Sequence, residues 1–341
     1  MTVLRSFVQR SAVKAALLVT LAVLLASVAG AQAPKKLKVA MVMAGSVSDK
    51  GFTEGAYNGL VRIKNELGFE TAFSENVARG DMVAAFRDYA TRGFDVIVGH
   101  GFPTADALVR VAGEFPERYF INTFGTISGK NIAVLECRWE DLFHVMGHLT
   151  GLMTKNGKVG IVGGWEAPGI RLQVESFRRG VLDGRPNADV QVIYTGTFYD
   201  AVKGKEAARA LIGQGVDILA HMADASGLGV IEAARENKLM AVGYFEDQRK
   251  LAPNLVISSA VIRSGDMIFL KVKGIADGKF EAGKFVYGLN EGVLQVGPYG
   301  EIVPPAVRAK IDAMVADIKS GKLKIPALDV KDLMKMQIRK L

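Results

Sequence analysis

Six short segments of this sequence carry the aromatic rings and carboxylates that could hold a small ligand. They read GSVSDKGF, HGFPTAD, TFGTISG, GWEAPGI, ADASGLG and YFEDQRK. The face of an aromatic ring stacks on a flat ligand, and a carboxylate accepts hydrogen bonds from ring or amino N–H groups and from hydroxyls. These residue types therefore favour non-covalent binding of a flat, partly polar solute such as a heteroaromatic base or a nucleoside.

The candidate ligand-binding residues in these segments are rings and carboxylates. Each has a simpler alternative, because a ring can pack its loop onto its own domain and a carboxylate before a helix can cap that helix. The capping alternative stays open for Asp49 and Asp224, which both precede helical patterns. The rings are Phe52, Phe102, Phe124, Trp165, Tyr244 and Phe245, and the carboxylates are Asp49, Asp224 and Asp247.

Motifs of common catalytic and cofactor sites are missing from the sequence. It has no G-x-S-x-G elbow, no P-loop and no complete G-x-G-x-x-G fingerprint. His144 and His148 stand four residues apart without the HExxH pattern, which favours a structural role over metal binding. His100 begins a strand-end loop that can reach the ligand, whereas His221 lies in an apolar strand and is expected in the core. We expect no catalytic residue, no metal and no cofactor.

The elements that must position these residues alternate along the chain. From Leu37 onward, short apolar runs alternate with segments of helical period, which is typical of a parallel sheet with crossover helices. Strands are predicted at LKVAMVMA, ETAFSE, DVIVGH, RYFINTF, IAVLECR, KVGIVGG, VQVIYTG, VDILAHM, LMAVGYF, LVISSAV and FVYGL. Helices are predicted near 53–66, 81–92, 104–114, 140–154, 169–183, 202–213, 226–237, 263–277 and 304–319.

This pattern divides into two α/β halves with similar openings, KVAMVMAGSVSDKGFTEGAYNGL and KVGIVGGWEAPGIRLQVESFRRGV. Ligands of open parallel sheets bind beyond the carboxyl ends of the strands, where all six segments stand. We therefore expect two hinged lobes with the six segments facing a common cleft. Lobe I is predicted at 34–138 plus about 260–285, lobe II at 139–259 plus about 286–325, and a tail at 326–341, with crossings near 137–140, 258–261 and 285–290.

The first 33 residues are predicted to be a cleaved secretory signal peptide. Arg5, Arg10 and Lys14 precede the apolar run AALLVTLAVLLASVAGA, which ends in small-x-small patterns. An uncleaved membrane anchor is the alternative, but the run is slightly short for a span. No Cys lies near the cleavage site, so we expect a periplasmic protein without a lipid anchor.

Charge and cysteine content exclude other classes of partner and of scaffold. Removing three basic residues with the signal peptide lowers the net charge from +8 to +5, and no dense basic stripe remains, so nucleic-acid binding is not expected. Cys137 is the only Cys, so no internal disulfide can form, and it is expected to be a small buried residue. We expect a monomer.

Five segments in order give the chain a resemblance to a known family: SDKGFTEGAYNGL, VGHGFPTADAL, VGIVGGWEAPGIRLQVESFRRGV, GLGVIEAARE and VGYFEDQ. Over about residues 36–300 the chain resembles the basic membrane protein family of ABC-transporter substrate-binding proteins, which includes the purine nucleoside receptors. The resemblance implies a type I periplasmic-binding-protein fold, a ligand between two doubly wound lobes, and delivery to an ABC permease in the inner membrane. It also implies that Phe52 matches the Phe of the receptor motif DKSFNQ, which lies against the base, and that Thr53 replaces the Asn beside it.

Three positions depart from the nucleoside receptors, all where those proteins carry carboxylates. The Asp that usually ends the first strand is replaced by Met43, and the Asp of AIID falls near Thr123. The first Asp of GVDVDQ is replaced by Phe245, which leaves Asp247 as the matching second carboxylate. Each lost hydrogen bond to a carboxylate costs a ribosyl ligand about 1.5–3 kcal/mol of binding free energy. The departures therefore favour a base without its sugar, or another compact aromatic solute, as the ligand.

Two other functions stay open at this point. An exported nucleoside-processing enzyme could use carboxylates beside a stacked base, although no clustered acidic metal site is visible in the sequence. A ligand sensor that reports to a membrane receptor would carry the same residues as a transport protein. A DNA-binding regulator of this fold class would begin with a helix-turn-helix, where this chain has a signal peptide.

Overall fold

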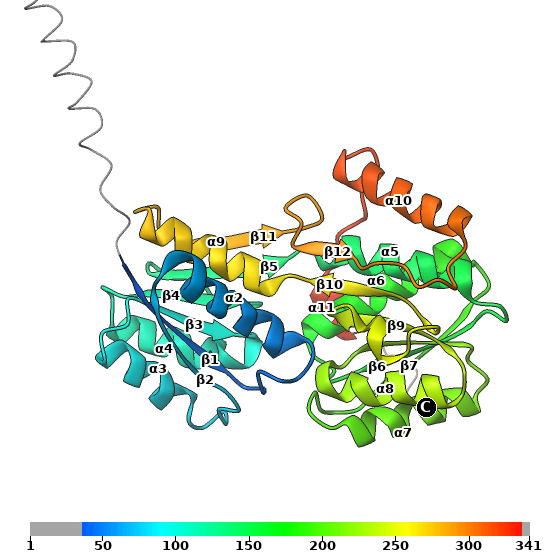
Figure 1. The fold of residues 1–341 in the computed structure, drawn as a ribbon, viewed down its shortest axis with the longest axis horizontal. Coiled ribbons are helices and arrows are strands. Elements are labelled where there is room, and N and C mark those ends of the chain that lie inside the picture. Colours follow the sequence, from blue (N-terminus) through cyan, green and yellow to red (C-terminus); the bar gives the residue numbers. More distant parts are fainter. Residues whose placement is uncertain (1–35, 336–341) are drawn as a thin grey trace, which may run out of the picture.

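The computed structural model describes residues 36–335, which form two lobes side by side (Figure 1). The predicted signal peptide, residues 1–33, lies outside the described residues, as does the end of the predicted tail, residues 336–341. Within residues 36–335, no helix is both long enough and apolar enough to cross a membrane.

The sheet of lobe I runs in the order β11-β5-β4-β3-β1-β2, and each neighbouring pair is parallel. The last five residues of β1 are buried, as expected for a strand with helices on both faces of its sheet. Because β1 lies between β2 and β3, its carboxyl end is the point where the strand order reverses. The strands are β1 (Lys38–Met43), β2 (Glu70–Ser74), β3 (Val96–His100), β4 (Tyr119–Thr123), β5 (Ile132–Cys137) and β11 (Gly283–Tyr287).

The sheet of lobe II repeats this arrangement in the order β12-β10-β9-β8-β6-β7. Its strands are parallel except for the edge strand β12, which pairs antiparallel with β10. The order reverses at β6, which lies between β7 and β8. The strands are β6 (Lys158–Gly163), β7 (Asp189–Tyr194), β8 (Ile218–Met222), β9 (Met240–Phe245), β10 (Val256–Ile262) and β12 (Leu294–Val296).

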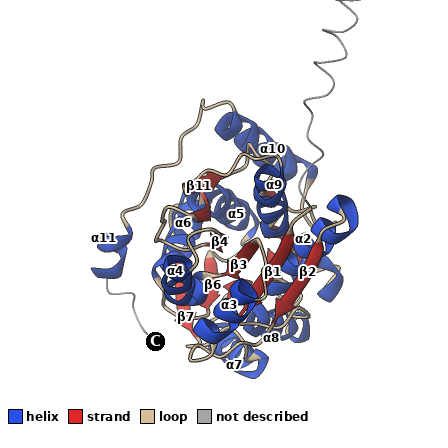
Figure 2. Ribbon diagram, turned by 90° about the vertical axis from the view of Figure 1, so that its left-hand side faces the viewer, coloured by secondary structure: helices blue, strands red, loops and turns tan. Residues whose placement is uncertain are grey.

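Helices cover both faces of each sheet. In lobe I, α2 packs on α9 against one face and α3 packs beside α4 against the other; in lobe II the corresponding pairs are α5 with α6 and α7 with α8. Helix α10 packs on α5, and a long loop then leads to α11, which packs on α6 (Figure 2). The helices are α2 (Phe52–Leu67), α3 (Met82–Thr91), α4 (Ala105–Glu114), α5 (Trp139–Met153), α6 (Pro168–Gly184), α7 (Ala201–Gly213), α8 (Asp224–Glu236), α9 (Ser264–Ala276), α10 (Pro305–Lys319) and α11 (Val330–Lys335), with 3-10 turns at Phe102–Thr104 and Gln248–Leu251.

The chain passes between the lobes after β5, after β10 and after β11. The first passage is at Arg138, between β5 and α5, and the second is at Arg263, between β10 and α9. The third is the segment 288–293, between β11 and β12. The predicted boundaries near 260 and 285 thus fall inside β10 and β11, because each of these strands continues to the edge of its sheet before the chain leaves the lobe.

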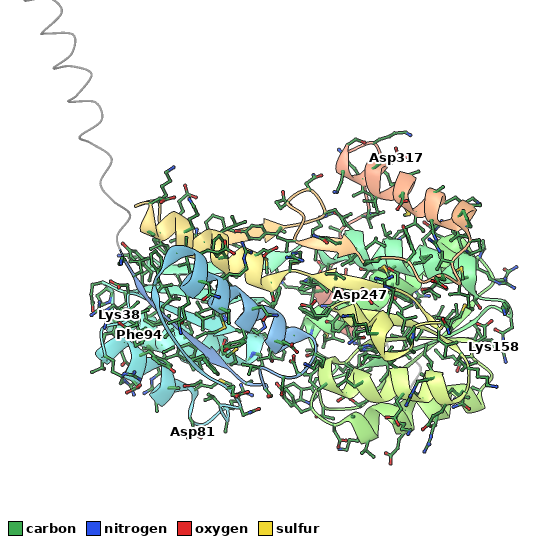
Figure 3. All side chains as sticks on the ribbon, viewed as in Figure 1. Lys38, Asp81, Phe94, Lys158, Asp247 and Asp317 are labelled. Atoms are coloured by element: carbon green, nitrogen blue, oxygen red, sulfur yellow. The ribbon has the colours of Figure 1, made fainter. Side chains whose placement is uncertain are left out.

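The strands of both lobes point toward the centre of the molecule. Lys38 and Lys158 begin β1 and β6, and they lie at opposite outer ends of the molecule (Figure 3). Asp247, which follows β9, lies near the middle of the same view. The carboxyl ends of the two sheets therefore face each other, and the loops after β1, β3, β6, β8 and β9 meet between the lobes.

Candidate functional site

A chain of hydrogen bonds holds the ring of Phe52 at the carboxyl end of the lobe I sheet. The Phe52 carbonyl lies 3.0 Å from Nε2 of His100, and Nδ1 of His100 lies 2.8 Å from the Thr123 hydroxyl. Because a carbonyl only accepts, Nε2 carries the proton, and Nδ1 accepts from Thr123. Burial lowers the pKa of His100 to about 3, so the ring is neutral at physiological pH. A Cβ on Gly101, where φ is 88°, would lie 3.0 Å from the Phe52 ring, so glycine makes room for that ring.

Aromatic rings from both lobes meet around Phe52. The Phe52 ring lies over the His100 imidazole, with centroids 4.0 Å apart, and meets the edge of Phe245 of lobe II at 5.1 Å. Phe124 lies 5.8 Å from Phe52 and 6.3 Å from Phe245. Phe124 and Phe245 have φ values of 58° and 64°, a region that bulky residues rarely occupy. Backbone strain of this kind clusters at ligand sites, and here it turns both rings into one cluster at the strand ends.

A second aromatic contact between the lobes lies at their surface. Phe102 follows β3 and Trp165 follows β6, and their rings meet at 6.4 Å although both side chains are 40% exposed or more. The Trp165 indole N–H donates to the Gly196 carbonyl, and its ring packs on Phe198 at 5.5 Å. Trp165 is therefore fixed to lobe II while its ring reaches lobe I.

Asp49 takes the capping role that the sequence left open. Its carboxylate accepts hydrogen bonds from the backbone N–H groups of Gly51, Thr53 and Glu54, at 3.0, 2.7 and 3.0 Å. Thr53 and Glu54 lie in the first turn of α2, whose N–H groups have no partner within the helix, and Gly51 immediately precedes that helix. The side chain of Thr53 is buried inside lobe I. Any contact of Asp49 or Thr53 with a ligand stays a prediction.

Asp224 does not cap its helix. It is the first residue of α8 and has a φ of 45°, and no side chain caps that helix. Within residues 36–335 its carboxyl has neither a hydrogen bond nor an ion pair. Burial raises the pKa of Asp224 well above its ordinary value, and the negative charge of Asp49, which lies in lobe I, raises it further.

Asp247 is engaged within its own loop. Its carboxylate forms an ion pair with Arg249, with the closest atoms 2.7 Å apart, and accepts from the Arg249 backbone N–H at 3.2 Å. The hydrogen bonds from Arg249 lower the pKa of Asp247. The sequence suggested Asp247 as a ligand-binding carboxylate, but Arg249 already occupies much of its accepting capacity.

Tyr199 and Glu246 also face the other lobe, and neither was among the predicted site residues. Tyr199 follows β7, and its ring carbon Cε1 lies 3.3 Å from where a Cβ on Gly45 of lobe I would stand. Burial, with the charges of Asp224 and Asp49, raises the pKa of Tyr199 to about 12. Glu246 lies against Gly55 of α2, with its Oε1 3.3 Å from the place of a Cβ there. The loop after β7 could have been found from the sequence, because it too follows a predicted strand.

His221, His144 and Tyr244 have partners within their own lobe. His221 is buried and contacts Oε1 of Gln248 through Nε2 at 2.8 Å, although its Nδ1 has no partner among the described residues. His144 contacts Asp183 at 2.9 Å. The Tyr244 hydroxyl donates to Gln173 at 2.8 Å, so this ring belongs to the core of lobe II. Over residues 36–335, no group of three or more His, Cys, Asp or Glu side chains is arranged to hold a metal.

Comparison with known protein families gives one match over most of the chain. Residues 36–329 match the family described as ABC transporter substrate-binding protein PnrA-like. This chain belongs to that family. The family prediction made from the sequence motifs is confirmed.

Individual relatives agree with this assignment. A purine-binding protein from Brucella abortus is 30% identical over 296 residues, which cover 86% of this chain and 84% of that protein. A solved solute-binding protein of an ABC transporter system from Conexibacter woesei superposes with a TM-score of 0.70 at 27% identity, covering 85% of this chain and 99% of the other. One from Aeropyrum pernix has a TM-score of 0.80 at 20% identity, covering 88% and 96%. The type I periplasmic-binding-protein fold with two parallel-sheet lobes is confirmed.

Proposed function

We propose that this family member is a periplasmic receptor that binds a purine base or nucleoside between its lobes and delivers it to an ABC permease. The observation that carries the proposal is the contact of Phe52 in lobe I with Phe245 in lobe II, at the carboxyl ends of the two sheets. A flat ligand that enters between opened lobes would exchange these ring contacts for stacking on its own faces, and would hold the lobes together. The purine-binding relative from Brucella abortus supports the same ligand class.

The positions that hold carboxylates in nucleoside receptors favour a base over a nucleoside here. Met43 is fully buried at the end of β1. The Thr123 hydroxyl already forms hydrogen bonds with His100 and with the Gly101 N–H. Phe245 is part of the ring cluster, and Asp247 is paired with Arg249. Few acceptors remain for ribose hydroxyls, so the base should supply most of the binding energy.

The test is ligand binding by the mature chain after refolding, which removes any co-purified ligand. We expect adenine, guanine or hypoxanthine to bind in titration calorimetry and to raise the melting temperature, with glucose as the negative control. Nucleosides should bind more weakly than their bases and be recovered intact. Absence of binding by every base and nucleoside would overturn the proposal, and release of free ribose from a nucleoside would replace it with an enzymatic function.

Transport needs a separate measurement in cells, because a sensor would bind the same ligand. We expect deletion of the gene to abolish uptake of the labelled base, and the restored gene to recover it. Normal uptake in the deletion strain would assign the protein to sensing instead.

A further inference from the structure

The carboxyl of Asp224 is in an unusual position for an acidic side chain. It is the second residue after β8, the strand next to β6 at which the order of the lobe II sheet reverses, and it has the left-handed φ of 45° that favours glycine. It is half-buried, and within the described chain it accepts no hydrogen bond from any side chain or backbone group. A carboxyl that makes no hydrogen bond within the protein and lies between the lobes is available to a hydrogen-bond donor on a ligand.

None of the titratable groups around Asp224 donates a hydrogen bond to it within residues 36–335. Asp49 faces it from the loop after β1 of lobe I, and its carboxylate accepts from three backbone N–H groups at and just before the start of α2. Tyr199, from the loop after β7, and Tyr244, in β9, are the other groups whose ionisation its charge affects. The Tyr244 hydroxyl already donates to Gln173.

Basic residues at this junction of the lobes are paired with other carboxylates. Lys50 lies 3.4 Å from Glu54, Arg249 lies 2.7 Å from Asp247, and Arg263 lies 2.6 Å from Asp266. Within residues 36–335 neither Asp224 nor Glu246 forms an ion pair, although the charge of Arg263 acts on Glu246. The field between the lobes is therefore negative, which disfavours an anionic ligand.

We propose that Asp224 is the specificity-determining residue of this site, where it accepts a hydrogen bond from an N–H donor on the edge of the ligand. This inference rests on the proposed function and narrows it. The site takes neutral or cationic heteroaromatic bases that bear an amino group, and it rejects the same bases when they carry a phosphate. An amino group of the base donates a hydrogen bond to the carboxyl of Asp224, which has no other donor within residues 36–335. A phosphate would instead add negative charge beside Asp49 and Asp224.

The experiment compares adenine, unsubstituted purine, adenosine and AMP on the full mature protein by titration calorimetry. For the natural sequence we expect adenine to bind at least tenfold more tightly than purine, and AMP to bind at least a hundredfold more weakly than adenosine. Asp224→Asn replaces one acceptor oxygen by an NH₂ donor and removes the negative charge, so adenine should lose at least tenfold in affinity while purine changes less. Asn tolerates positive φ, so this variant should fold.

Two further variants keep the result decisive. Asp224→Gly suits the backbone conformation and removes the carboxyl, so it should reproduce the loss for adenine even if the Asn variant folds poorly. Asp189→Asn makes the same chemical change at the exposed start of β7, on the outer end of lobe II, and should leave every affinity within twofold. Adenine binding that is unchanged in both Asp224 variants, or AMP binding as tight as that of adenosine, would overturn the inference while leaving the proposed receptor intact. Failure of every base to bind the natural sequence would instead overturn the receptor itself.

Discussion

The imidazole of His100 supports Phe52 in two ways at once: its ring lies 4.0 Å from the Phe52 ring, and its Nε2–H donates to the Phe52 carbonyl at 3.0 Å. The first contact orients the side chain, and the second fixes the backbone at the start of α2. Thr123 fixes the imidazole in turn. A ring positioned from both ends loses little freedom when a ligand stacks on it, so more of the stacking energy contributes to affinity.

Replacing Phe52 by Ala should weaken binding of an aromatic base by about 1–3 kcal/mol, because its stacking partner in lobe I is lost. Titration calorimetry measures the change. Phe73→Ala is the matched control, since Phe73 is an exposed ring of lobe I that packs on Tyr57 in edge contact at 4.8 Å. Equal affinities for the Phe52 variant and the control would remove Phe52 from the site.

Protonation of His100 should contribute to the pH dependence of the free energy of unfolding. Its pKa in the folded protein, about 3, lies below the value of about 6.5 in the unfolded chain, so the unfolded chain takes up the proton first as the pH falls. The contribution of His100 to the free energy of unfolding is complete above pH 6.5 and falls by about 2 kcal/mol by pH 5. Urea titrations at pH 7.5 and 5 should therefore show a smaller decrease for His100→Gln than for the natural sequence. Parallel decreases in the two proteins would contradict a neutral buried imidazole.

The contact of Phe102 with Trp165 should report closure of the lobes. The chain has two tryptophans, so a Trp139→Phe background leaves Trp165 as the only tryptophan, whose emission is excited selectively. In that background, Phe102→Ala should shift the emission to longer wavelength and weaken the ligand by about 0.5–1.5 kcal/mol, because one aromatic pair of the closed state is lost. Phe73→Ala again serves as control. An emission spectrum that changes neither with Phe102→Ala nor with ligand would show that Trp165 stays clear of lobe I in solution.

The close contact of α2 with α9 should tolerate no side chain at Gly59. A Cβ there would lie 2.5 Å from both Cα and the carbonyl oxygen of Gly265, the second residue after the passage from lobe II. Gly59→Ala should lower the free energy of unfolding by about 1–3 kcal/mol, because backbone must move to admit the methyl group. Gly113→Ala is the same change in α4, where a Cβ meets no atom within 4 Å, and it should be neutral or stabilising by up to about 1 kcal/mol. Thermal or urea unfolding of the two variants decides the matter, and equal stabilities would refute the packing argument.

The sequence by itself determined the elements and the order in which they follow one another. The predicted helix at 53–66 is observed as Phe52–Leu67, and that at 263–277 as Ser264–Ala276. Periodicity and turn residues are local properties of the chain, and they suffice to locate each strand-end loop. The resemblance in SDKGFTEGAYNGL and the other quoted segments was likewise enough to identify the family.

Only the tertiary structure decided what each side chain in those loops contacts. The sequence offered Asp49, Asp224 and Asp247 as candidate ligand-binding carboxylates, the first two with helix capping as an alternative. In the structure α2 engages Asp49, Arg249 engages Asp247, and Asp224 alone among them is left without a partner in the described chain. It also brought Phe52 into contact with Phe245, 193 positions away in the sequence. It placed β11 in the sheet of lobe I and the next strand, β12, in the sheet of lobe II. Hydrogen bonds, burial and electrostatic coupling act over a few ångströms in space, and neighbours in space at the junction of two lobes are set by the way the chain crosses between them.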